Sequence, residues 1–181
     1  AYYDGVVEVD LSAIRPMIAL PMHPSNAFTI EELNANLEDI LHACEQDVQK
    51  LIGRKDVSLD LCSKIENGKL RVDQGVIAGC AGGLYDSIYE AASILKGHTG
   101  GCGDYALSVY PGSQPIMMEL VRTGVIHDLM ASGATVRTAF CGPCFGAGDV
   151  PANGALSIRH TTRNFPSREG SKPGNGQLAG V

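Results

Sequence analysis

The chain lacks any apolar run approaching the roughly 18 residues that a membrane-spanning helix needs. Its first residues also lack the basic and apolar segments of a secretory signal peptide. Basic residues are too few for a broad nucleic-acid surface, because 14 Lys and Arg face 20 Asp and Glu, for a formal net charge of −6. We therefore expect a cytoplasmic protein that binds neither membranes nor nucleic acids.

Six cysteines are present, and without an export signal we expect reduced thiols rather than disulfides. Cys44 lies on the apolar face of a predicted helix, and Cys62 follows two leucines one and three positions earlier. Both are expected to be small buried hydrophobic residues. Cys102 lies in a glycine-rich loop and is given no role. Three cysteines remain for chemistry.

The length of 181 residues and a hydrophobic content of 44% suit one domain with a sizeable core. A helix is predicted to begin after Thr29, which forms a capping box with Glu32, and to end at Gly53. Its apolar residues recur at helical spacing, so it is expected to pack on a sheet. His42 lies on this helix and is interpreted as a surface or hydrogen-bonded histidine rather than a ligand.

Beyond this helix, short apolar segments alternate with helical patterns. Strands are predicted at 76–78, 105–109, 135–140 and 156–161, and helices at 85–95, 114–122 and 125–131. A further short strand is predicted at 6–9 within an otherwise irregular N-terminal segment. The alternation predicts an α/β fold with a parallel sheet flanked by helices.

Cys80, Cys141 and Cys144 are placed for one metal centre. The last two form a Cys-x-x-Cys turn in the segment Phe-Cys-Gly-Pro-Cys-Phe-Gly, and the first lies in Gly-Cys-Ala-Gly-Gly. Cys80 and Cys141 each directly follow a predicted strand, so parallel strands would bring both to one sheet edge. The flanking glycines would let a cluster approach the backbone. Three ligands leave one metal position open for a substrate.

Other sites share this spacing. The same thiols could form a zinc-binding structural or interaction domain, although structural zinc prefers four ligands and only three cysteines are well placed. Cys141 and Cys144 could instead form a thiol redox module, which usually sits at a helix N-terminus. Gly146, Gly148 and Pro151 follow this pair and disfavour a helix. Both alternatives stay open at this point.

Four motifs occur in a defined order. They are the glycine-flanked Cys80, Tyr-Pro-Gly-Ser at 110–113, the Cys-x-x-Cys segment at 140–146 and Thr-Arg-Asn-Phe-Pro-Ser-Arg at 162–168. In order and spacing, the chain resembles the third domain of the aconitase family of hydro-lyases from roughly residue 6 onward. It departs from the family at 81–83, where Ala-Gly-Gly replaces Thr-Asn-Ser, and at Thr162, where an asparagine often stands. A divergent hydratase is therefore indicated.

The resemblance implies that Cys80, Cys141 and Cys144 bind a [4Fe–4S] cluster whose open iron acts as a Lewis acid. It also implies that Arg163 and Arg168 bind the carboxylates of a small anionic substrate, a hydroxy polycarboxylic acid that is dehydrated or hydrated. Guanidinium suits this role because it pairs with a carboxylate through two parallel hydrogen bonds. The catalytic acid and base stay unknown, since no matching motif is present in this chain.

Family members are much longer, so the chain is expected to be part of a larger enzyme and inactive by itself. Other domains of the same enzyme would then supply the acid–base residues. We expect a lead-in from a preceding domain at 1–28, a cluster-binding α/β domain at 29–165 and a Gly-rich C-terminal loop or linker at 166–181.

Overall fold

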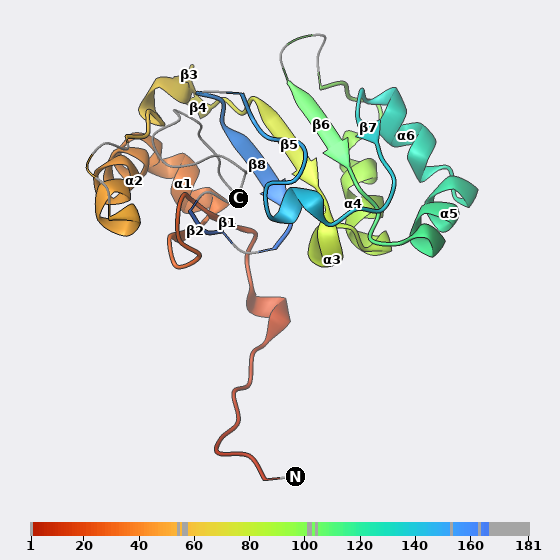
Figure 1. The fold of residues 1–181 in the computed structure, drawn as a ribbon, viewed down its shortest axis with the longest axis horizontal. Coiled ribbons are helices and arrows are strands. Elements are labelled where there is room, and N and C mark those ends of the chain that lie inside the picture. The colour runs from red at the N-terminus through yellow and green to blue at the C-terminus, as the bar shows by residue number, and fades with distance from the viewer. Residues whose placement is uncertain are drawn as a thin grey trace.

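The computed structural model describes residues 2–53, 55, 58–100, 103, 105–152, 154–162 and 164–166. A four-stranded sheet lies at its centre, with the strand order β7-β6-β5-β8 (Figure 1). These strands are β5 (Gln74–Ile77), β6 (Ala106–Val109), β7 (Thr135–Val136) and β8 (Ser157–His160). Every neighbouring pair is parallel. The predicted α/β fold with a parallel sheet flanked by helices is therefore confirmed.

The strand register brings the carboxyl ends of three strands to one edge. Ile77 pairs with Val109 on one side and with His160 on the other. The chain proceeds from β5 through β6 to β7, and β8 then lies on the opposite side of β5. The strand order thus reverses between β5 and β8. Open α/β sheets bind their ligands beyond the carboxyl ends of the strands at such a point.

Three helices pack beside β6 and β7 and have the predicted bounds. They are α4 (Tyr85–Leu95), α5 (Gln114–Arg122) and α6 (Val125–Ala131). Ser113 caps α5, because its hydroxyl accepts a hydrogen bond from the N–H of Ile116. The core that they share contains Ile88, Ala92, Val109, Leu120, Val125, Leu129 and Ala134.

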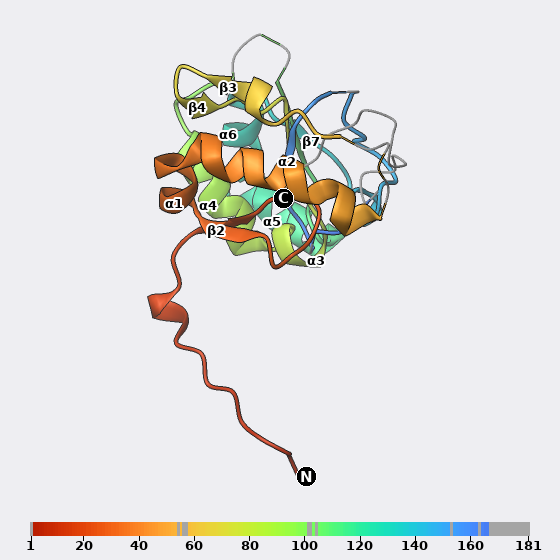
Figure 2. The same ribbon diagram turned by 90° about the vertical axis from the view of Figure 1, so that its left-hand side faces the viewer.

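A second core surrounds the N-terminal helices. Its elements are β1 (Met17–Ala19), β2 (Ala27–Thr29), α1 (Ile30–Ala35), α2 (Leu37–Ile52), β3 (Ile65–Glu66) and β4 (Lys69–Leu70). Figure 2 shows α2 lying between the antiparallel β1–β2 and β3–β4 pairs. The core consists of Leu20, Leu33, Leu37, Leu41, Cys44, Val48, Leu59, Leu61 and Leu156. The helix therefore packs on these small sheets rather than on the parallel sheet.

The predicted helix from Thr29 to Gly53 is two helices. The capping box of Thr29 with Glu32 is present. The helix breaks at Asn36, whose φ of −131° and ψ of 38° lie outside the helical region. Leu33 before the break and Leu37 after it both lie in the core, so the apolar face continues across the break.

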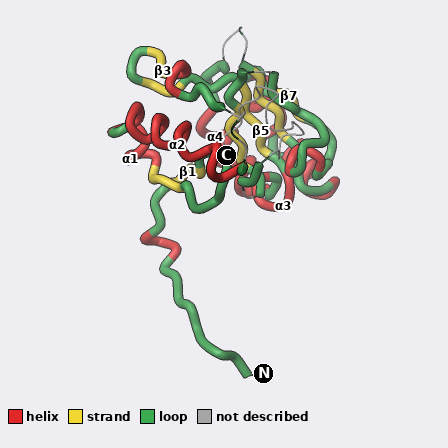
Figure 3. The backbone as a smooth tube through the Cα atoms, turned by 60° about the vertical axis from the view of Figure 1, so that its left-hand side comes forward, coloured by secondary structure: helices red, strands yellow, loops and turns green. Residues whose placement is uncertain are grey.

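One strand prediction is wrong, and another extends too far. Residues 6–9 form no strand, and Figures 1 and 3 show this segment extending away from the body. Val6 and Val7 are 90% exposed, and no strand among the described residues pairs with them. The predicted strand at 135–140 ends at Val136, because its partner β6 ends at Val109. The irregular segment before Thr29 instead contains a short helical turn, η1 (Leu11–Ala13), and the paired strands β1 and β2.

No helix among the described residues combines the length and the apolar composition that crossing a bilayer would require.

Candidate functional site

Cys80 lies directly beyond the carboxyl end of β5. Ala78 follows the strand and donates its N–H to the carbonyl oxygen of His160 at 3.0 Å. The short helix α3 (Gly79–Gly82) then carries Cys80, whose side chain is exposed. The structure therefore places Cys80 at the sheet edge that the sequence predicts, beside the end of β8.

Cys141 and Cys144 lie in a second tight turn. Cys141 immediately precedes the helical turn η3 (Gly142–Cys144), and the N–H of Cys144 donates to the carbonyl oxygen of Cys141 at 3.0 Å. Pro143 fixes one backbone torsion of this turn. Cys141 is exposed, whereas Cys144 is only 7% exposed. A turn of three residues lacks the helix N-terminus that activates a redox cysteine, which disfavours a thiol redox module.

The two cysteine turns contact each other. α3 packs against η3, and the sulfur of Cys144 lies against the backbone of Gly79, where it would collide with any Cβ. Gly79 has a φ of +75°, a region that L side chains rarely adopt. A glycine is therefore required here for two reasons. The fold brings Cys144 against the residue that precedes Cys80, although these cysteines are 64 positions apart in the sequence.

We expect Gly79→Ala to destabilise the chain more than Gly97→Ala, as measured by denaturant unfolding. Gly97 has a similar φ of +78° but open space around it, so alanine there costs only the strain of the left-handed region, about 1–2 kcal/mol. Alanine at position 79 must also displace the Cys144 sulfur, and overpacking adds about 1–3 kcal/mol. Equal losses from the two substitutions would show that the contact with Cys144 is unimportant.

The Pro-Gly-Ser segment joins the same site. The N–H of Tyr110 donates to the carbonyl oxygen of Ile77 at 2.8 Å, and the N–H of Gly112 donates to that of Gly83 at 2.7 Å. These bonds attach the segment after β6 to both ends of the Cys80 turn. Three of the four sequence motifs therefore meet at the carboxyl edge of the sheet.

A buried arginine that the sequence analysis missed holds the Cys-x-x-Cys turn on the sheet. Arg159 lies on β8 and is 3% exposed. Its Nη1 donates to the carbonyl oxygen of Pro143 at 3.0 Å, and its Nη2 donates to the carbonyl oxygen of Asp149. Further bonds of 3.0 Å reach Gln74 Oε1 and Ser157 Oγ. One planar guanidinium thus ties the Cys-x-x-Cys turn and the segment that follows it to β5 and β8.

Asp149 is a second missed residue, and its carboxylate is held in a polar network beneath the loop. Tyr110 donates its hydroxyl to Asp149 Oδ2 at 2.5 Å, and Ser108 donates to Oδ1 at 3.2 Å. Arg137 Nη2 lies 3.7 Å from Oδ1, and its guanidinium also lies over the Tyr110 ring. Burial, and next the hydrogen bond to Asp149, raises the pKa of Tyr110 to about 12. Tyr110 therefore stays a neutral donor.

The segment after β8 carries the last motif. Asn164 is buried and donates its Nδ2 to the carbonyl oxygen of Leu20 at 2.6 Å, which ties this segment to the N-terminal core. Arg163 and Arg168, the predicted carboxylate ligands, lie outside the described residues, as does Cys102.

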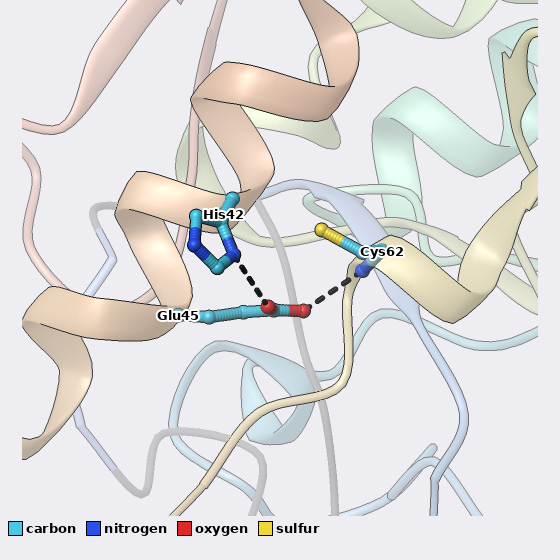
Figure 4. A group of neighbouring side chains, drawn as sticks. All are labelled: His42, Glu45 and Cys62. Carbon is cyan, nitrogen blue, oxygen red and sulfur yellow. Dashed lines mark hydrogen bonds and ion pairs between the residues drawn. The ribbon is translucent and has the colours of Figure 1, made fainter.

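Another group of possible metal ligands lies far from these cysteines in the fold. His42 and Glu45 of α2 face Cys62 of the helical turn η2 (Cys62–Lys64), and their ligand atoms lie within 4.8 Å of one another (Figure 4). Cys62 is half-buried, so its predicted burial is only partly realised, whereas Cys44 is buried as predicted. Burial, and next the charge of Glu45, raises the pKa of the Cys62 thiol.

Comparison with known proteins shows to which family the chain is related. The sequence profile of the aconitase family (aconitate hydratase) matches residues 1–181. The chain belongs to the aconitase family. It is 32% identical over 171 residues to the 3-isopropylmalate dehydratase large subunit of Clostridium botulinum (strain Alaska E43 / Type E3), covering 94% of this chain and 32% of that protein. The same subunit from Moorella thermoacetica (strain ATCC 39073 / JCM 9320) is 30% identical over 184 residues, covering 99% of this chain and 35% of that protein. This aconitase-family chain thus spans about a third of the length of these relatives.

The glycine pair at 82–83 has a structural reason in this aconitase-family chain. A Cβ at Gly82 would overlap the carbonyl oxygen of His160, and one at Gly83 would overlap backbone atoms of Gly79 and Gly112. The end of β8 and the Pro-Gly-Ser segment occupy the space that side chains would need. Polar side chains at these two positions would require the neighbouring backbone to move.

Proposed function

We propose that this chain is the cluster-binding part of a [4Fe–4S] hydro-lyase that dehydrates or hydrates a hydroxy polycarboxylic acid. Cys80, Cys141 and Cys144 would hold the cluster. The observation that carries the proposal is the packing of Cys144 against Gly79, at the point of the sheet where the strand order reverses. Membership of the aconitase family supports the reaction class.

The three cysteines fit an iron–sulfur cluster by their chemistry. The predicted ligands are all thiols, which suit iron–sulfur clusters and zinc better than hard cations. Gly79 leaves the side of the Cys80 turn that faces Cys144 without a side chain. When bound, the cluster would supply an iron with no protein ligand, which polarises the substrate hydroxyl as a Lewis acid.

The protein's own groups would then bind and orient the substrate. Arg163 and Arg168 follow β8, whose end lies beside the Cys80 turn. We propose that their guanidinium groups pair with substrate carboxylates in a bidentate manner. The hydroxyl of Tyr110 donates a hydrogen bond to the Asp149 carboxylate beneath the Cys-x-x-Cys turn, so neither residue is proposed as the catalytic base. The acid–base groups would come from the rest of the enzyme or from a partner subunit.

The relatives' names narrow the substrate class. The relatives are large subunits of 3-isopropylmalate dehydratase. We therefore propose that the substrate of the enzyme containing this chain is a 2- or 3-hydroxy acid with at least two carboxylates. The test is a hydration and dehydration assay of the full-length enzyme under anaerobic conditions against a panel of such acids. Activity on hydroxy dicarboxylates supports the proposal, whereas an iron-loaded enzyme inactive on the whole panel contradicts it. The isolated chain is expected to be inactive.

Replacing Arg168 with lysine in the full-length enzyme is expected to weaken substrate binding at least about tenfold. Lysine keeps the charge but loses the planar fork, and one charge-assisted hydrogen bond is worth roughly 1.5–3 kcal/mol. The measurement is KM together with iron content, with Arg122→Lys on the exposed surface of α5 as the control. Normal kinetics would remove Arg168 from the substrate site. Loss of iron would instead assign it to supporting the cluster.

A further inference from the structure

His42, Glu45 and Cys62 bring three different metal-ligand types together on two elements. Figure 4 shows the imidazole and the carboxylate on α2 turned toward the cysteine at the start of η2. Their ligand atoms all lie within 4.8 Å of one another. A triangle with sides of that length has its centre about 2.8 Å from each corner, compared with about 2.0–2.3 Å for the bonds of zinc to nitrogen, oxygen and sulfur. Side-chain movements of about 0.5–0.8 Å would close the site.

The carboxylate of Glu45 is already fixed in place. Its Oε1 accepts the backbone N–H of Cys62 at 2.8 Å, and its Oε2 lies 3.8 Å from His42 Nδ1. The Glu45 side chain is only 18% exposed. The bond to Cys62 therefore links the two elements and leaves the second oxygen facing the imidazole. This arrangement resembles the hydrogen-bonded carboxylates that support metal sites in general.

Gln46 can set the orientation of the imidazole. Its Nε2 lies 2.8 Å from His42 Nε2. Turning the amide end of Gln46 places its oxygen there, where it would accept the Nε2–H and leave Nδ1 as the free lone pair toward Glu45. A metal-binding histidine commonly donates its other ring N–H to such an acceptor.

The electrostatic surroundings favour a cation. Burial raises the pKa of the Cys62 thiol, and the negative charges of Glu45, Glu38 and Asp60 raise it further. A thiolate among them would be repelled unless a positive charge were bound. A mixed set of sulfur, nitrogen and oxygen ligands suits zinc, which is borderline soft and imposes no geometry of its own.

We propose that His42 Nδ1, Glu45 and Cys62 Sγ bind one Zn²⁺ ion, with water in the fourth position. The His42 side chain is 64% exposed, so solvent reaches the site. The ion would connect the middle of α2 to η2, which directly precedes the β3–β4 pair. Its binding would stabilise that connection and is separate from the cysteines at the sheet edge.

Cobalt titration tests this site. We would titrate Co²⁺ into the full chain carrying Cys80→Ser and Cys141→Ser, which removes the other clustered thiols at exposed positions. A thiolate-to-cobalt absorption band at micromolar cobalt, reversed by Zn²⁺, is expected. Cys62→Ser should abolish the band, and His42→Gln should weaken the affinity at least about tenfold. His127→Gln, a histidine that is 85% exposed on α6, is the matched control and should change nothing.

Glu45→Gln separates binding from folding. Its amide oxygen can still accept the N–H of Cys62, so the metal-free melting temperature should stay close to that of the parent while cobalt affinity falls. Zinc should raise the melting temperature of the parent, which is the chain carrying Cys80→Ser and Cys141→Ser, but not that of the same chain with Cys62→Ser added. The proposal is overturned if the band persists in Cys62→Ser, if His42→Gln binds as tightly as the parent, or if binding needs millimolar metal.

Discussion

Replacing Arg159 with methionine is expected to lower the free energy of unfolding by about 3 kcal/mol or more. The substitution removes the buried donor of the carbonyl oxygens of Pro143 and Asp149, whereas Gln74 Oε1 still accepts from Ser157 Oγ at 2.6 Å. Each such loss costs about 1–3 kcal/mol. Denaturant unfolding of the chain measures the effect. Iron uptake by the full-length enzyme should fall as well, because the Cys-x-x-Cys turn is no longer fixed.

Two further variants serve as controls for the effect of Arg159→Met. Arg122→Met removes an arginine that is 72% exposed on α5, and its change should stay within about 0.5 kcal/mol. Arg159→Lys keeps the charge but cannot reach all acceptors at once, so an intermediate loss is expected. If Arg159→Met is as stable as Arg122→Met, the arginine does not support the loop.

Asp149 and Tyr110 are expected to be energetically coupled by about 1.5–3 kcal/mol, the range for a hydrogen bond to a charged group. The test is a double-mutant cycle of Asp149→Asn and Tyr110→Phe, measured by unfolding. Asparagine suits this position because Asp149 has a φ of +46°, a region that asparagine tolerates better than most residues. Each single variant should lose stability, and the double variant should lose less than their sum.

The control cycle pairs Asp149→Asn with Tyr85→Phe. Tyr85 donates its hydroxyl to Thr123 at 3.3 Å on the exposed side of α4 and α5, away from Asp149. Additive losses are expected there. Additive losses in the Tyr110 cycle as well would contradict the short hydrogen bond of 2.5 Å.

The helices could be predicted from the sequence because apolar spacing and capping residues lie within or next to each helical segment. α4, α5 and α6 each have regular apolar spacing, and Ser113 supplies a cap beside α5. The break at Asn36 was not predicted, since apolar spacing continues across it. β7 was predicted too long because a strand ends where its partner ends, and that partner lies elsewhere in the sequence.

The cysteine turns were predicted from motif order and strand ends, and the packing of Cys144 on Gly79 brings two of these turns together. The network beneath them was not predicted. Tyr110 and Asp149 are 39 positions apart, and no periodicity connects them. Arg159 was not predicted either, because a strand pattern would place the apolar Ile158 inward. The structure instead buries Ser157 and Arg159 and exposes Ile158 and His160.

The central claim is that Cys80, Cys141 and Cys144 hold a [4Fe–4S] cluster with one open iron. The most direct test is Mössbauer spectroscopy with iron analysis on the full-length enzyme, reconstituted anaerobically with ⁵⁷Fe and sulfide. We predict about four irons per chain in the parent and in Cys62→Ser, with one iron site changing when substrate is added. Serine at position 80, 141 or 144 should abolish the full cluster. A complete cluster in Cys141→Ser, or zinc in place of iron in the parent, would contradict the account.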